Sequence, residues 1–91
     1  MTLRFEWDES NRKHIARHCV TPAEAEQVVV NDPVDLEMQT EDGEERLIQL
    51  GETDRGRILV VITTWRGDRI RVITALRAPR QLRDLYFALS R

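Results

Sequence analysis

The chain has 91 residues, of which 41% are hydrophobic and 33% are charged, with a formal net charge of −2. This length suits one domain over residues 1–91, and the composition excludes an intrinsically disordered chain. No apolar run approaches the roughly 18 residues that span a membrane, and the N-terminal segment lacks the apolar core of a signal peptide, so we expect a cytoplasmic protein with no membrane partner.

The first predicted element is a short strand. Residues 3–7 alternate apolar and charged side chains, which places Leu3, Phe5 and Trp7 on one face. Asp8 follows and is a favourable N-cap residue, because its carboxylate accepts hydrogen bonds from the first free amides of a helix. A strand followed by a helix is therefore predicted at the N-terminus.

The helix after Asp8 carries two histidines one turn apart. Asn11, Ile15 and His18 share one stripe of this helix, and His14 neighbours His18. A zinc site of the HExxH type needs Glu directly after the first His, where this chain has Ile15. Catalysis by His18 as an acid or base remains open, but we favour a structural role, since the helix C-terminus stabilises a protonated His18.

Cys19 is the only cysteine and follows the histidines at a predicted break between two helices. A lone cysteine can form no internal disulfide, which fits a reducing compartment and excludes a cysteine-rich zinc site. We expect a buried structural thiol here.

The second helix has the strongest local signal in the sequence. Thr21 can accept a hydrogen bond from the N3 amide, Pro22 fits the first helical position, and Glu24 can reach back to the amide of Thr21. Asn31-Asp32-Pro33 ends the helix. Its core-facing stripe comprises Ala25, Val28 and Val29.

The rest of the chain reads as four antiparallel strands. Residues 34–38 and 45–50 alternate around an acidic turn at 41–44, which predicts a hairpin. The β-branched run at residues 58–65 predicts a central strand covered on both faces, and a turn leads into a last strand at 69–75.

On that last strand, Arg69 and Arg71 are expected to share a face with Ile73, while Ile70 and Val72 share the other. Pro79 then opens a C-terminal helix. Its apolar positions recur at helical spacing at Leu82, Leu85, Tyr86 and Leu89.

Charge is distributed unevenly along the chain. Residues 1–50 carry five basic groups and twelve acidic ones, for a net −7, whereas residues 51–91 carry nine arginines and four acids, for a net +5. Arginine binds phosphate through two parallel hydrogen bonds and stacks on bases, so the C-terminal half suits a polyanion. Solvated strand and helix faces explain the composition equally well.

A candidate anion site combines residues of the last strand and the last helix. Arg71, Thr74, Arg77 and Arg80 are expected to converge on one group, where arginines would stabilise charge on a phosphate while a base deprotonates a 2′-hydroxyl, without a metal. Trp65 or Tyr86 could stack a base or instead pack in the core, as favoured for Tyr86. Spacing alone does not distinguish RNA from a protein carboxylate.

Four segments together resemble the BrnT family of type II toxins. They are FEWD at residues 5–8, NRKHIARHCVTPAEAE at 11–26, GEERLIQLGETDRGRILVVITTW at 43–65 and RIRVITALRAPRQLRDLY at 69–86. Each motif is weak alone, but their order and spacing are specific and cover nearly the whole chain. The family pattern has Gly where Cys19 stands.

The resemblance implies an α+β fold of the RelE/ParE-like kind, with two N-terminal helices and a C-terminal helix packed on an antiparallel sheet. It implies a cytoplasmic, metal-independent ribonuclease that needs no cofactor, inhibits translation and arrests growth. It also implies a ribbon-helix-helix antitoxin as partner, RNA as substrate, and contact with operator DNA only through the antitoxin complex.

The resemblance also indicates site residues. Arg57 matches the family's Gly-Arg strand entry, Arg71 its Arg-x-Ile-(Ser/Thr)-Ala strand, and Arg80 and Tyr86 its last helix. With the residues singled out above, the predicted catalytic set is Arg57, Arg71, Arg77, Arg80 and His18, and the predicted RNA-binding set is Arg69, Trp65 and Tyr86. No metal ligands are predicted.

One position departs from the family pattern. Many members have arginine directly after Ser/Thr-Ala, whereas this chain has Leu76 there and Arg77 one place later. Either a local bend lets Arg77 compensate, or a phosphate contact and much of the activity is lost. The alternative to a ribonuclease is thus a catalytically weak or inactive partner in an antitoxin and operator complex, and a gyrase-directed toxin is a third possibility.

Overall fold

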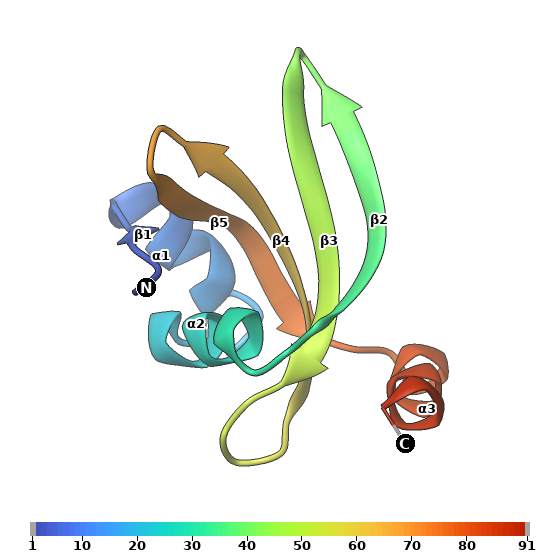
Figure 1. The fold of residues 1–91 in the computed structure, drawn as a ribbon. Helices are drawn as coiled ribbons and strands as arrows, with labels where there is room; N and C mark the ends of the chain where they lie inside the picture. Colours follow the sequence, from blue (N-terminus) through green and yellow to red (C-terminus); the bar gives the residue numbers. More distant parts are fainter. Residues whose placement is uncertain (1, 91) are drawn as a thin grey trace.

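The predicted order of elements is present in the computed structural model, which describes residues 2–90 (Figure 1). Three helices and five strands follow one another in the α+β arrangement expected. In chain order they are β1 (Phe5–Glu6), α1 (Glu9–Ala16), α2 (Pro22–Val30), β2 (Val34–Glu41), β3 (Glu44–Glu52), β4 (Ile58–Arg66), β5 (Arg69–Arg77) and α3 (Arg80–Leu89).

The five strands form one mixed sheet in the order β1-β5-β4-β3-β2. Strands β2 to β5 pair antiparallel, as predicted, and the β2–β3 hairpin turns at Asp42 and Gly43, whose positive φ values of 51° and 78° suit a tight hairpin turn. The expectation of a purely antiparallel sheet is wrong for β1, which runs parallel to β5. This pairing is possible because two helices and three strands separate β1 from its partner.

Both N-terminal helices begin at the predicted caps. Asp8 and Asn11 form a capping box on α1, and Thr21 and Glu24 form one on α2. The N-terminal strand is shorter than predicted, because the chain leaves the sheet after Glu6 so that Asp8 can cap α1. Local hydrogen bonds of this kind set where each helix starts.

The core lies on both faces of the sheet, and β4 contributes to each. On one face, α1 and α2 cover Leu59 and Val61, which pack with Ile15 and Val28. On the other face, Ile58 and Val60 pack with residues of β3 and α3. The alternation of these buried side chains confirms that β4 is a central strand covered on both sides.

Strand β5 contains a β-bulge at Ile73. Ile62 of β4 pairs with Thr74 and the next residue, Thr63, pairs with Val72, so Ile73 has no partner. Val72 and Ala75 consequently both face α1 and α2, although they are three residues apart. The predicted alternation along β5 is therefore correct only up to the bulge.

Helix α3 lies apart from the other two helices, beyond the opposite face of the sheet (Figure 1). Leu82 and Tyr86 pack against the sheet, whereas Leu85 and Leu89 are exposed, so only half of the predicted apolar stripe is buried. Within residues 2–90 no helix has the length and apolar character needed to cross a membrane.

Replacement of Gly51 by alanine should lower the free energy of unfolding by about 1 to 3 kcal/mol. A Cβ at this position would lie 2.9 Å from Cγ1 of Val28 and 3.1 Å from Cβ of Pro33. Val28 is fully buried and both neighbours are conformationally stiff, so neither can move aside cheaply. Urea denaturation of Gly51→Ala measures the effect, and addition of Val28→Ala should relieve part of it; an unchanged midpoint would contradict the close packing.

Candidate functional site

Two of the predicted arginines meet where β4 begins and β5 ends. Arg57 immediately precedes β4, and Arg77 is the last residue of β5 and pairs opposite Leu59. They line a hollow of about 420 Å³, to which α3 contributes Arg83 and Phe87. This hollow, called here the arginine hollow, is lined by three arginines and a phenylalanine.

The Arg57 side chain is fixed by two contacts with the N-terminal helices. Its Nη1 donates to Oε2 of Glu24 at 2.7 Å and to the carbonyl oxygen of Cys19 at 3.1 Å. Burial opposes the charged form of Glu24, but hydrogen bonds from Thr21 and Arg57 outweigh it and hold the pKa of Glu24 below its ordinary value. Arg57 is therefore oriented before any ligand arrives.

Arg77 and Arg83 differ in how they are held. Nη1 of Arg83 donates to the carbonyl oxygen of Ala78 at 2.7 Å, which fixes it at the start of α3. Arg77 is exposed, and none of the carboxylates within residues 2–90 forms an ion pair with it. An unpaired, exposed guanidinium beside two positioned ones is suited to binding a phosphate.

His18 lies on the loop that contacts Arg57. Helix α1 ends at Ala16, so His18 follows the helix and its predicted place in the helical stripe is wrong; its ring is exposed and contacts the edge of the His14 ring at 5.8 Å between centroids. It immediately precedes Cys19, whose carbonyl accepts the hydrogen bond from Arg57. His18 is thus close in sequence to a residue that borders the arginine hollow.

The expectation of a buried Cys19 thiol is wrong. Cys19 is exposed and has a φ of 58°, in the left-handed region. This conformation reverses the chain between α1 and α2 so that the next residue, Val20, enters the core at 3% exposure.

Arg71 is distant from the arginine hollow. Its Nη1 donates to Oε1 of Glu6 and to Oδ2 of Asp8, each at 2.9 Å. Arg71 and Arg77 are six residues apart on β5, or about 20 Å, and the bulge between them puts their side chains on opposite faces. The expected convergence of Arg71 with Arg77 and Arg80 on one group is therefore not found.

The Glu6 and Asp8 contacts place Arg71 in a second charged cluster at the N-terminal end of α1. The hydrogen bond from Arg71 is the main cause that lowers the pKa of Asp8, and the hydrogen bond from the amide of Asn11 is the second. The Asp8 hydrogen bond likewise raises the pKa of Arg71 against the effect of burial. This cluster joins β1, β5 and α1 and satisfies its own charges.

The remaining predicted residues lie in four different places. Arg80 is exposed on the first turn of α3, and Thr74 is half-buried on β5. Tyr86 is 7% exposed between α3 and the sheet, so it packs in the core, which was the favoured expectation for this residue. Burial and the carboxylates of Glu52 and Asp32 raise its pKa.

Arg69 and Trp65 flank the β4–β5 turn at the other end of these strands. Both are exposed, and Trp65 retains 62% of its accessible surface. The predicted RNA-binding residues are thus not gathered around the arginine hollow.

Three residues of the arginine hollow and its border were missed by the sequence reasoning. Arg83 and Phe87 are one helical turn apart, a spacing that puts them on one side of α3 and could have identified them as a pair. Glu24 was recognised only as a capping residue, because its contact with Arg57 spans 33 positions and leaves no local signal.

Acidification should lower the free energy of unfolding as the pH falls below about 5. The folded-state pKa values of Asp8 and Glu24 lie below their ordinary values, so the charged forms stabilise the fold at neutral pH and this contribution is lost as the pH falls through the folded-state values. Urea denaturation between about pH 7 and pH 3 measures it. Asp8→Asn, which keeps the cap, should show a shallower pH dependence; equal slopes would contradict this assignment.

Within residues 2–90, no group of three or more His, Cys, Asp or Glu side chains is arranged to hold a metal ion. A search of curated proteins finds no match to the chain. A family model described as "Ribonuclease toxin, BrnT, of type II toxin-antitoxin system" matches residues 7–81.

Proposed function

The chain belongs to the BrnT family of ribonuclease toxins of type II toxin-antitoxin systems, and from this premise we propose that it cleaves RNA at the arginine hollow without a metal ion. The observation that carries the proposal is the meeting of Arg57, Arg77 and Arg83 around one hollow. Three guanidinium groups supply the positive charge that a phosphodiester in its transition state requires. Arg57 and Arg83 are already held by hydrogen bonds, which reduces the cost of organising the site.

The reaction is a transesterification within the RNA. A base removes the proton from a 2′-hydroxyl, the 2′-oxygen bonds to phosphorus, and the bond from phosphorus to the 5′-oxygen breaks as that oxygen is protonated. The products are a 2′,3′-cyclic phosphate and a 5′-hydroxyl. The arginines stabilise the charge that grows on the non-bridging oxygens, and the Phe87 ring, 41% exposed, can stack a neighbouring base.

His18 is the candidate general base. Histidine is the side chain most often used for proton transfer, and this one is exposed beside Cys19, which accepts a hydrogen bond from Arg57. Replacement by glutamine keeps the size and polarity but removes the proton acceptor, so His18→Gln with full cleavage activity would exclude the assignment.

The position of Arg77 supports an active enzyme despite Leu76. Leu76 packs with the cluster under α3, and the next residue, Arg77, lines the arginine hollow. The bulge at Ile73 shifts the alternation of side chains along β5, so that Leu76 faces α3 and Arg77 faces the other way. We propose that Arg77 takes the role that the family assigns to an arginine one place earlier.

The proposal extends to the fold and to the cellular context. Two N-terminal helices on one face of the sheet and α3 beyond the other support a RelE/ParE-like arrangement for the single toxin domain. We place the protein in the cytoplasm, where its RNA substrate is found. A type II toxin has a protein antitoxin, and we propose one of the ribbon-helix-helix kind that carries the complex to operator DNA.

The test is cleavage of purified RNA by the isolated protein in excess EDTA. The expected result is fragments with 2′,3′-cyclic phosphate and 5′-hydroxyl ends, unchanged in yield by the chelator. Intact RNA with and without added Mg²⁺ would favour the alternative, a catalytically weak or inactive toxin that acts in an antitoxin and operator complex. The substitution of Leu76 for arginine is the observation that favours this alternative.

A further inference from the structure

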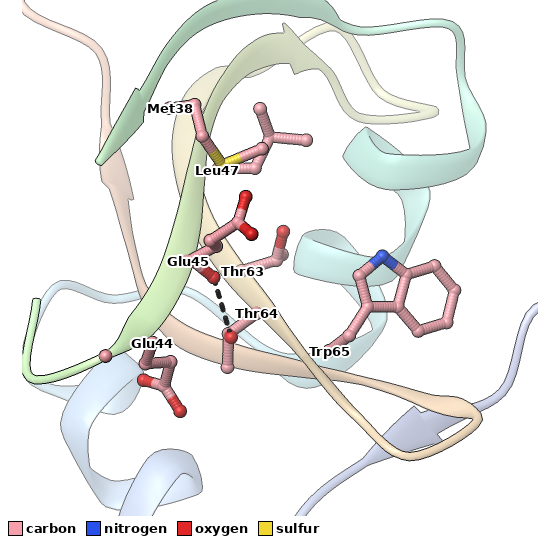
Figure 2. Close-up of a pocket in the computed structure, with 8 residues that line it drawn as sticks. Met38, Glu44, Glu45, Leu47, Thr63, Thr64 and Trp65 are labelled. Carbon is pink, nitrogen blue, oxygen red and sulfur yellow. Dashed lines mark hydrogen bonds between the residues drawn. The ribbon is translucent and has the colours of Figure 1, made fainter. Parts of the chain in front are cut away.

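A second hollow lies at the other end of the sheet, between the β2–β3 hairpin and the end of β4 (Figure 2). Its volume is about 460 Å³. Met38 pairs with Leu47, which pairs with Thr63, so three adjacent strands present these side chains on one face. Thr63 is two residues after Val61, which places the hollow on the same side of the sheet as α1 and α2.

The lining of this hairpin hollow combines apolar side chains with threonines and carboxylates, and its apolar side chains are accessible. Met38 is 55% exposed and Trp65 is 62% exposed, and Figure 2 shows both side chains at the rim with Leu47 near Met38. Single exposed apolar residues are ordinary, but tryptophan and methionine around one hollow are typical of the centre of a protein interface. Helices α1 and α2 cover this face of the sheet only beside other parts of the strands (Figure 1).

The charge around the hairpin hollow is negative. Within residues 34–45 there is no lysine or arginine, and there are six acids, namely Asp35, Glu37, Glu41, Asp42, Glu44 and Glu45. By strand alternation Glu45 shares the face of Leu47 and the hollow, whereas Glu37 and Glu41 lie on the opposite face. Arg46 pairs with two of them, Glu41 at 3.0 Å and Glu44 at 3.2 Å, and Arg66 also pairs with Glu44 at 3.0 Å. Among the ion pairs of residues 2–90, none involves Asp42 or Glu45, and Glu45 itself borders the hollow.

This charge decides between possible occupants. RNA is a polyanion and would be repelled by the acidic hairpin. A second copy that docked through the same hollow would bring acid against acid, because a two-fold interface uses the same surface twice. A basic polypeptide is attracted by the acids, and its apolar side chains can enter between Met38 and Trp65.

We propose that the hairpin hollow binds a basic amphipathic helix of the antitoxin. This inference rests on the proposed function, which requires such a partner. Three strands about 4.8 Å apart make a floor about 10 Å wide, which matches the diameter of one helix. The bound helix would extend the helical layer begun by α1 and α2, with apolar residues on Met38, Leu47 and Trp65 and basic residues toward Asp42 and Glu45.

Tryptophan fluorescence provides the first measurement. The protein is titrated with purified ribbon-helix-helix antitoxin, and the emission of Trp65 should move to shorter wavelength as its ring is buried. Trp7 is already half-buried and donates to Glu26 at 2.7 Å, so it contributes a constant background. The Trp65→Phe variant should still bind the antitoxin but should show no emission shift.

The affinity for the antitoxin, measured by calorimetry, provides the second measurement. Met38→Ala and Glu45→Lys should each weaken antitoxin binding by about tenfold or more. Leu89→Ala is the matched control, because Leu89 is an equally exposed apolar residue at 56% on α3, and its affinity should stay within about twofold.

Three outcomes would overturn the inference. The first is an unchanged affinity for the antitoxin in both Met38→Ala and Glu45→Lys. The others are the same Trp65 emission shift when an RNA oligonucleotide replaces the antitoxin, or when the protein alone is concentrated. RNA cleavage by free Met38→Ala is assayed alongside. Normal cleavage with affinity independent of the hairpin hollow overturns this inference and leaves the ribonuclease proposal standing. Antitoxin binding that depends on the hollow, without RNA cleavage by any form, supports the inference and overturns the ribonuclease proposal.

Discussion

Replacement of Arg77 by alanine should reduce the rate of RNA cleavage by about a hundredfold or more. Arg77 is the one guanidinium lining the arginine hollow for which the structure of residues 2–90 shows no hydrogen-bond or ion-pair partner, so its charge is available to the phosphate. The loss should appear mainly in kcat, because the charge on the phosphate oxygens grows toward the transition state. Initial rates on a short labelled RNA, with the melting temperature of each variant as a folding check, measure the effect.

Two further variants sharpen this prediction. Arg77→Lys keeps the charge but loses the planar fork, so it should retain intermediate activity. Arg12→Ala removes an exposed arginine from α1, away from the hollow, and should cleave at the normal rate. Full activity in Arg77→Ala together with loss of activity in Arg71→Ala would instead place the catalytic centre in the Glu6, Asp8 and Arg71 cluster.

Replacement of Asn11 by alanine should lower the free energy of unfolding by about 3 kcal/mol. Asn11 is 3% exposed, and its Nδ2 donates to the carbonyl oxygens of Glu6 at 3.0 Å and Val72 at 3.1 Å. Its Oδ1 accepts from the amide of Asp8 at 2.8 Å. One side chain thus joins β1, β5 and the start of α1, and its removal leaves buried polar groups without partners.

Urea denaturation at neutral pH tests this prediction. Ser10→Ala is the control, since Ser10 is the exposed neighbour in the same turn and its replacement should change the free energy of unfolding by less than about 0.5 kcal/mol. Similar destabilisation in both variants would show that the first turn of α1, rather than the buried amide, determines the effect.

The features predicted correctly from sequence depend on residues close together in the chain. The N-cap at Asp8 and the capping box at Thr21 each involve positions three apart, and the hairpin depends on a turn whose residues suit positive φ. The covered central strand β4 is marked by an unbroken β-branched run. In each case the chemistry that forms the element is visible within one short window.

The features that were missed depend on distant pairing. The bulge at Ile73 is defined by the register of β5 against β4 and by the packing of Val72 and Ala75 under the N-terminal helices. The sequence analysis ended this strand at residue 75 and expected Arg71 and Arg77 to converge, whereas the structure separates them along β5 and places them on opposite faces. The contact of Arg57 with Glu24 likewise requires α2 and the start of β4 to be adjacent.

The bulge divides β5 into two stretches of opposite phase. Val72 before the bulge and Ala75 after it both face α1 and α2. Residues an even number of positions from Val72 share this face before the bulge, and residues an even number from Ala75 share it after the bulge. An arginine at position 76 would therefore lie under α3, whereas an arginine at position 77 lines the arginine hollow. In related chains, the presence of the extra residue at 73 should therefore determine which of these two positions carries the arginine.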